Sequence, residues 1–211
     1  VSGCGSSGSA QVEGELLSTE NRLRQLESAL NAGSLRNATL IKQYADILQD
    51  RRPELAPLLR QLRKETGVES PIYKSLNERF QRVRDGSETF ENWTDKVAEL
   101  QSIQSGAETS VYNDALSDTV NVIADMSDGE LARVNAVSQE QEQKLNNSKS
   151  YGAGSQYVGN PHYGHWSHGS GGSFWAWYGQ YAFFSSMFGS NRYYYNDWSR
   201  GRGYSYYHDV G

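Results

Sequence analysis

Residues 10–30 read AQVEGELLSTENRLRQLESAL, a mostly polar stretch in which apolar residues recur at steps of three, four and seven. The recurring residues are Val12, Leu16, Leu23, Leu26 and Leu30. This spacing places side chains along one narrow stripe of an α-helix, with the polar Thr19 at one position of the stripe. Gly33 follows where such a helix would stop. The stretch therefore predicts a helix that pairs with other helices along its length.

The same helical spacing continues to about residue 147, with residues between the runs that begin and end helices. Pro53 interrupts a second run that starts near Leu35, because proline cannot donate the backbone hydrogen bond that a helix interior requires. Ser70-Pro71 predicts an N-cap followed by proline at the first helical position. Ser87 predicts the cap of the helix after that.

The apolar faces of these helices are narrow. The second helix is expected to bury Leu35, Ala38, Ile41, Tyr44, Ile47 and Leu48. The last is expected to bury Leu116, Val120, Ile123, Leu131, Val134 and Leu145. Stripes of about two apolar residues in seven favour an elongated bundle over a thick globule. The expected fold is mostly α, an elongated antiparallel helical bundle or coiled coil followed by a Gly/aromatic-rich, low-complexity C-terminal tail.

The composition changes near Ser150. Of 14 Tyr, 11 lie from Tyr151 onward, together with four of the five Trp and all four His. No Asp, Glu, Lys or Arg occurs between Lys149 and Arg192. The chain therefore divides into an N-terminal leash at residues 1–9, a helical domain at 10–150 and a Gly/Tyr/Trp-rich tail at 151–211.

The only cysteine lies in the sequence Val1-Ser2-Gly3-Cys4. A branched apolar residue, two small residues and a cysteine resemble the lipobox of bacterial lipoproteins. Small side chains are also what a signal peptidase accepts beside the bond that it cuts. The chain begins with Val1 rather than Met, and we expect that a signal peptide has been removed.

The resemblance to bacterial lipoproteins implies a covalent lipid, such as palmitate, on Cys4. It also implies a cut between Gly3 and Cys4 and a location in the cell envelope. Gly5 rather than Asp after the cysteine favours the outer membrane in that family. The Ser and Gly residues that follow would form a flexible leash. No other cofactor is expected.

The aromatic residues of the tail are densest between Ser173 and Phe188, where SFWAWYGQYAFFSSMF carries no charge. Candidate contact residues for a partner or membrane are Phe174, Trp175, Trp177, Tyr178, Tyr181, Phe184 and Phe188. Most of them would share one side of a helix. The stretch is shorter than the roughly 20 apolar residues of a membrane span. Packing against the helical domain or another copy competes with contact at a membrane surface.

Three histidines lie three residues apart in PHYGHWSHG, at His162, His165 and His168. Three imidazoles within seven residues could bind Zn, Ni or Cu. Pro161 and Gly164 argue against a helix here, and there is no nearby carboxylate or cysteine to complete a site. A glycine-rich loop that contains histidine is the competing interpretation.

Composition and motifs together favour a protein that is not an enzyme. A net charge of −5 gives no electrostatic support for binding nucleic acid. The phosphate-binding, nucleophile-elbow, zinc-protease and paired-cysteine motifs are missing from the sequence. We expect a structural or protein-interaction lipoprotein, with helices as spacer or assembly element, a bilayer as partner, and an envelope protein or second copy at the tail. The alternative is a ligand-binding module whose tail binds metal through the histidines, or a glycan or membrane surface through its rings.

Overall fold

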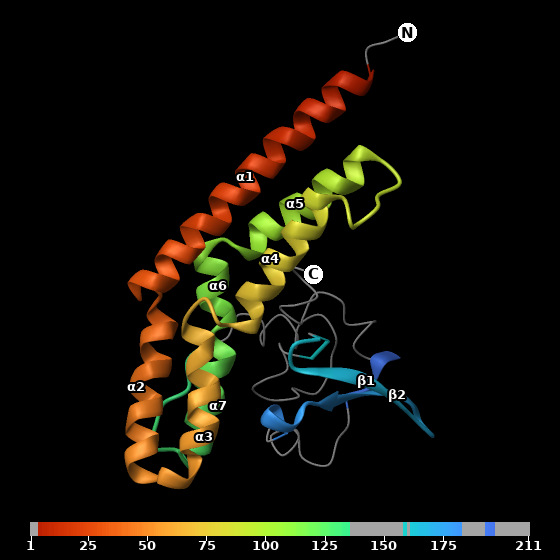
Figure 1. Cartoon of the computed structure of the whole chain (residues 1–211). Coiled ribbons are helices and arrows are strands. Elements are labelled where there is room, and N and C mark those ends of the chain that lie inside the picture. Colours follow the sequence, from red (N-terminus) through yellow and green to blue (C-terminus); the bar gives the residue numbers. More distant parts are fainter. Residues whose placement is uncertain (1–3, 136–157, 160, 183–192, 197–211) are drawn as a thin grey trace.

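The computed structural model of the chain describes residues 4–135, 158–159, 161–182 and 193–196. It is mostly helical, as the sequence predicts, with a small β-hairpin near the C-terminus (Figure 1). The helices are α1 (Cys4–Ala32), α2 (Arg36–Arg51), α3 (Ala56–Arg63), α4 (Pro71–Asp85), α5 (Trp93–Gly106), α6 (Thr109–Ala115) and α7 (Ser117–Met126). Short 3-10 helices are η1 (Pro53–Leu55), η2 (Lys64–Thr66) and η4 (Gly179–Tyr181), and the strands are β1 (Gly164–Gly169) and β2 (Gly172–Trp177).

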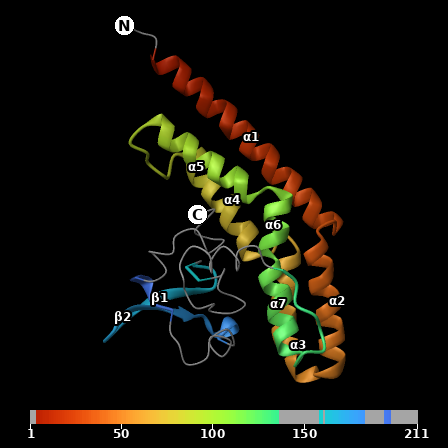
Figure 2. The same ribbon diagram turned by 180° about the vertical axis from the view of Figure 1, so that it is seen from behind.

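The helices form an elongated body. The N-terminal part of α1 runs beside α5, and α2, α3 and α7 pack together at the opposite end. The hairpin lies beside α4, on the side of the helices away from α1 (Figure 2).

The seam between α1 and α5 follows the predicted stripe. Leu23, Leu26 and Leu30 are buried, and Thr19 is fully buried among them. The Thr19 hydroxyl donates to the Glu15 carbonyl oxygen at 2.7 Å and accepts from the Gln104 amide at 3.0 Å. A polar residue is accommodated in the apolar stripe because its hydroxyl is satisfied from both helices.

The end of α1 at Gly33 confirms the predicted stop. Gly33 has a φ of +65°, which glycine adopts without the steric cost of a side chain. Its N–H donates to the Leu30 oxygen at 3.2 Å, and the Ser34 N–H donates to the Ala29 oxygen at 3.1 Å. This pair of bonds is the Schellman arrangement, which satisfies carbonyl groups left over at a helix end.

Two predictions about helix starts need correction. Ser70 stands at the N-cap position of α4, with Pro71 at the first helical position as predicted, but its side chain does not cap the helix. Instead of Ser87, Asn92 caps α5 by accepting a hydrogen bond from the Asp95 N–H at 2.9 Å.

Two predicted apolar faces are also wrong in part. In α2, Ala45 is buried and Ile47 is 39% exposed, because the buried face steps through residues 38, 41, 45 and 48. After α7 ends at Met126, Asn121 binds the non-helical chain, donating to the Val134 carbonyl oxygen at 3.0 Å and accepting from its N–H at 2.8 Å. Leu131 and Val134 therefore follow the last helix rather than extend it, and Leu145 lies outside the described residues.

Residues 173–177 belong to strand β2, so the aromatic residues there do not share one side of a helix. β1 and β2 pair antiparallel, with Trp166 opposite Trp175, and Ser170 and Gly171 form the turn. Cross-strand pairs of large rings stabilise such a hairpin. Its Trp175 belongs to the same buried core as the helices, together with Val158, Tyr163 and Tyr181.

The expected leash is helical from Cys4 onward, since α1 begins there. Gly8 is buried, and a Cβ atom placed on it would lie 2.9 Å from Trp93 Cδ1. The absence of a side chain lets the indole of α5 lie directly against the first turns of α1. This contact joins the predicted leash to the helical body.

Two glycines of α1 give a matched stability test. Gly14 is exposed, and a Cβ atom there would meet nothing within 4 Å. We predict that Gly14→Ala raises the free energy of unfolding by about 1 kcal/mol, since alanine is the better helix former. Gly8→Ala should gain less or lose stability, because the methyl group displaces Trp93. Urea unfolding of both variants measures the difference, and equal gains would contradict the close contact.

Candidate functional site

Cys4 is the first residue of α1, at the end of the helix far from α2 (Figure 1). Among the described residues, no helix combines the length and the apolar character needed to cross a bilayer.

The three predicted metal ligands are not brought together. His162 Nε2 lies 3.0 Å from Glu78 Oε2 on α4, whereas the His165 ring stacks on Tyr178 at 5.7 Å between ring centroids. His168 and His165 are an odd number of positions apart on β1, so they point to opposite faces of the hairpin. The described residues contain no group of three or more His, Cys, Asp or Glu side chains that could hold a metal ion. The three-histidine metal site is therefore not formed in this structure.

The predicted contact residues of the tail do not form one surface. Trp175 and Tyr181 are only 6% and 5% exposed and belong to the core, so they are not available for an outside partner. Phe174 and Trp177 are half-buried, and Tyr178 is 40% exposed. Phe184 and Phe188 lie outside the described residues. The rings of Trp166, Trp175 and Trp177 meet edge to face on one side of the hairpin.

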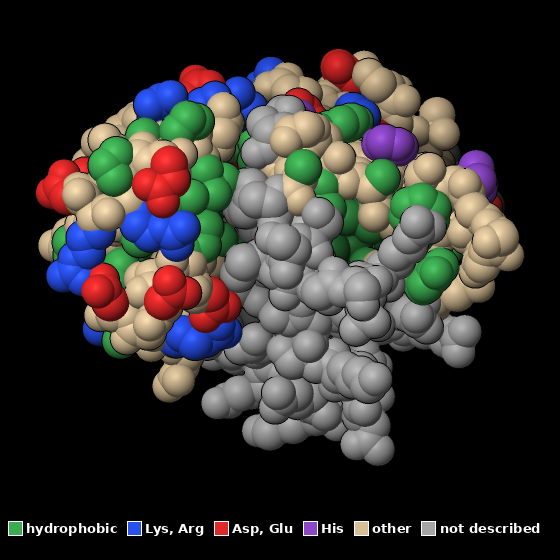
Figure 3. All heavy atoms as spheres, turned by 90° about the horizontal axis from the view of Figure 1, so that it is seen from below, with side chains coloured by type: hydrophobic (Ala, Val, Ile, Leu, Met, Phe, Trp, Pro, Cys, Tyr) green, Lys and Arg blue, Asp and Glu red, His purple; other side chains and the backbone are tan. Residues whose placement is uncertain are grey.

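The surface around the hairpin carries fewer charged side chains than the surface of the helices. Acidic and basic side chains crowd one side of the view in Figure 3, while the side that carries the histidines has few. Many of the charged side chains of the helical part form ion pairs, as Lys74 and Glu69 do at 3.0 Å. The exposed hairpin residues therefore offer neutral rings and hydroxyl groups.

A buried carboxyl group lies where the hairpin segment meets the helices. Glu65 of η2 is 1% exposed. The Tyr163 hydroxyl donates to its Oε1 at 2.6 Å, and the Ser70 hydroxyl donates to its Oε2 at 2.9 Å. The Ser70 side chain thus binds Glu65 and does not cap α4, the helix that follows it. Tyr163 comes from just before β1, 98 residues away along the chain.

The surroundings of Glu65 favour its protonated form. Burial raises its pKa from an ordinary 4.5 to about 7, against the opposing effect of the Tyr163 and Ser70 hydrogen bonds. Burial also raises the pKa of Tyr112 in α6 well above its usual range and that of Tyr181 to about 12. The site is therefore a carboxyl group enclosed by neutral hydroxyl groups.

The enclosed Glu65 is suited to holding segments together rather than to catalysis. The Tyr163 ring packs edge to face on Tyr181 at 4.9 Å between centroids. A carboxyl group with a pKa near 7 can exchange a proton at neutral pH, but at 1% exposure it has no room for a substrate. Sequence reasoning missed this residue, because nothing in Lys64-Glu65-Thr66-Gly67 marks it as buried.

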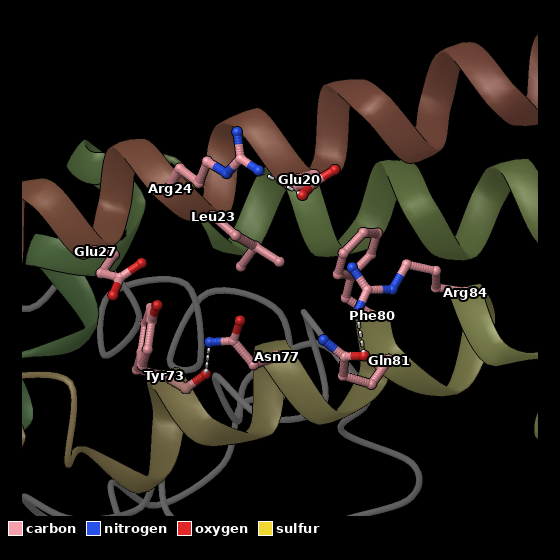
Figure 4. Close-up of a pocket in the computed structure, with 9 residues that line it drawn as sticks. All are labelled: Glu20, Leu23, Arg24, Glu27, Tyr73, Asn77, Phe80, Gln81 and Arg84. Carbon is pink, nitrogen blue, oxygen red and sulfur yellow. Dashed lines mark hydrogen bonds and ion pairs between the residues drawn. The ribbon is translucent and has the colours of Figure 1, made fainter.

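A shallow polar groove lies between α1 and α4, as Figure 4 shows. Its lining residues are Glu20, Leu23, Arg24, Glu27, Tyr73, Asn77, Phe80, Gln81 and Arg84. Arg24 pairs with Glu20 at 2.7 Å, and the Arg84 guanidinium lies over the Phe80 ring at 5.4 Å. Its volume of about 150 Å³ is below the roughly 300 Å³ at which small-molecule sites begin.

Removal of the Tyr163 hydroxyl should destabilise the protein. We predict that Tyr163→Phe lowers the free energy of unfolding by about 2 kcal/mol, because a buried carboxyl oxygen loses its donor. The matched control is Tyr178→Phe, which removes a hydroxyl from an exposed ring of the same segment and should change stability by less than about 0.5 kcal/mol. Urea denaturation at pH 7 measures both, and similar values for the two variants would refute the assignment.

Comparisons with family models, with curated proteins and with solved structures give no match for this chain.

Proposed function

We propose that this protein is a lipid-anchored structural or interaction protein of the bacterial cell envelope, attached to the outer membrane through an acylated Cys4. The observation that carries the proposal is the lipobox-like sequence Val1-Ser2-Gly3-Cys4, which contains the only cysteine of the chain. A cysteine thiol is the group to which such lipids are attached, and the small residues before it suit the peptidase that would expose it.

The energetics of the anchor favour more than one acyl chain. Each CH₂ group buried in a bilayer contributes about 0.8 kcal/mol, and stable attachment needs two chains or a second membrane contact. The described helices offer no membrane-spanning segment as a substitute. Two or more acyl chains on Cys4 would meet this requirement.

The length of α1 supports a role as a spacer. At about 1.5 Å per residue, its 29 residues form a rod about 44 Å long that begins at the proposed lipid site. Pairing with α5 along the Thr19 seam stiffens this rod. An anchor on Cys4 would be joined to a rigid helix rather than to the flexible leash expected from the sequence.

The hairpin supports a role in contacting other molecules. Tyr178 and Tyr195 are 40% and 42% exposed, and the neighbouring Trp166 and Trp177 are half-buried. Aromatic rings with little surrounding charge are typical of protein contact surfaces. An envelope protein or a second copy of this chain is the proposed partner.

The anchor is tested by Cys4→Ser in the protein expressed from its own gene in its native cell. We predict that the parent co-sediments with envelopes and has an intact mass above that of its polypeptide by the mass of the acyl groups. Cys4→Ser should lose both properties. Ser9→Ala, which changes an exposed residue of the same helix, should keep both.

Two results would overturn the proposal. The first is a parent protein whose mass shows no lipid. The second is a Cys4→Ser variant that stays in the envelope fraction to the same extent as the parent.

A further inference from the structure

Two neighbouring residues tie the hairpin segment, residues 161–182, to the helices. Tyr163 donates to the buried Glu65 of η2 at 2.6 Å. His162, immediately before it, lies 3.0 Å from the Glu78 carboxylate of α4. Tyr163, Trp175 and Tyr181 add apolar contact, since all three belong to the core that includes the helices. The segment is therefore held by one set of apolar contacts and by two contacts that involve acidic side chains.

The contact between Tyr163 and Glu65 depends on the protonation of Glu65, because the described residues around the carboxyl group carry no positive charge. Among the described residues, the titratable groups that face it are tyrosines. They are Tyr163 and Tyr181 from the hairpin segment and Tyr112 from α6, with Tyr73 of α4 beside Tyr112. No Lys or Arg among the described residues forms an ion pair with Glu65. An ionised carboxylate without a counter-charge is costly at a site away from water, whereas the protonated acid is not.

The direction of the pH effect follows from the pKa of Glu65. It lies near 7 with the segment docked and near 4.5 when the carboxyl group meets water. A raised pKa in the docked state means that docking binds a proton. Its contribution to docking is full below about pH 4.5 and is lost as the pH rises through about 7.

The His162–Glu78 contact is a second, weaker tie between the segment and α4. The pair is partly exposed and contributes less than the buried site.

We propose that Glu65, Ser70 and Tyr163, assisted by His162 and Glu78, form a proton-dependent latch that docks the hairpin segment on η2 and α4 and releases it as the pH rises through neutrality. The latch is independent of the lipid anchor. We expect the helices to stay folded on release, since the Thr19 seam and the Gly33 bend are held by hydrogen bonds within the helices themselves. Over the full range the docking equilibrium changes by about two orders of magnitude.

The test follows the full-length chain between pH 5 and pH 9 by two signals. Tryptophan emission reports docking, because Trp175 is 6% exposed and belongs to the core that the hairpin shares with the helices. Far-UV circular dichroism reports the helices. We expect the emission to shift to the red, with a midpoint between pH 5 and pH 8, while the helical signal stays constant.

Variants separate the latch from general effects of pH. Glu65→Gln keeps the shape of the side chain without its charge, and we expect no emission change across the range. Glu69→Gln removes an acidic residue that is largely exposed on the same loop and should behave as the parent does. Tyr163→Phe retains the acid but loses its donor, and should shift the midpoint to lower pH by about one unit. The Tyr163→Phe variant keeps the test decisive if Glu65→Gln does not fold.

Three outcomes would overturn the latch. One is a parent emission that does not change with pH. Another is a change that persists in Glu65→Gln, or whose midpoint is unmoved in Tyr163→Phe. The last is a loss of helical signal in step with the emission, which would indicate global unfolding in place of release.

Discussion

The buried carboxyl group of Glu65 is the constraint on which the union of the two halves of this chain depends. It comes from the helical part, which carries most of the charges, yet the hydroxyl that donates to one of its oxygens comes from Tyr163, in the stretch without charged residues between Lys149 and Arg192. Without Tyr163 the Glu65 carboxyl group would be open to water on one side. Val158, Tyr163, Trp175 and Tyr181 therefore share the helical core, and the compositional boundary near Ser150 is not a boundary of packing.

Polar contacts of this kind recur because the chain has little apolar material, at 36% of its residues. The Asn37 amide and N–H bind the backbone and side chain of Asn113, which fixes α2 against α6. Arg79 is 4% exposed and donates to Glu99 at 2.9 Å, which fixes α4 against α5. Apolar stripes this narrow tolerate sliding, whereas a buried polar group is satisfied in one register only. The polar contacts thus specify positions that the apolar stripes leave open.

The helical fold could be predicted because its signals are local. Gly33 and Gly86 adopt positive φ values at the ends of α1 and α4, and Pro71 begins α4, each for a reason contained in the residue itself. The buried faces of the helices were harder to predict from the sequence than the helix ends. Tyr44 and Ile47 fit the helical period of α2 about as well as Ala45 does, and only the position of the neighbouring helices decides that Ala45 is buried.

The hairpin and the Glu65 site could not be predicted because each is decided by distant residues. In Ser173–Phe188 apolar residues occupy 11 of 16 positions, so neither a period of two nor one of 3.6 stands out. Pairing of Trp175 with Trp166 selects the strand at residues 172–177. For Glu65 the partner is 98 residues away, and a lone glutamate beside lysine is most often a surface residue. The same reasoning explains the three histidines. Their regular spacing would converge on a helix, but on a strand and its preceding loop it sends them to different neighbours, and one of them, His162, becomes part of the contact that holds the segment in place.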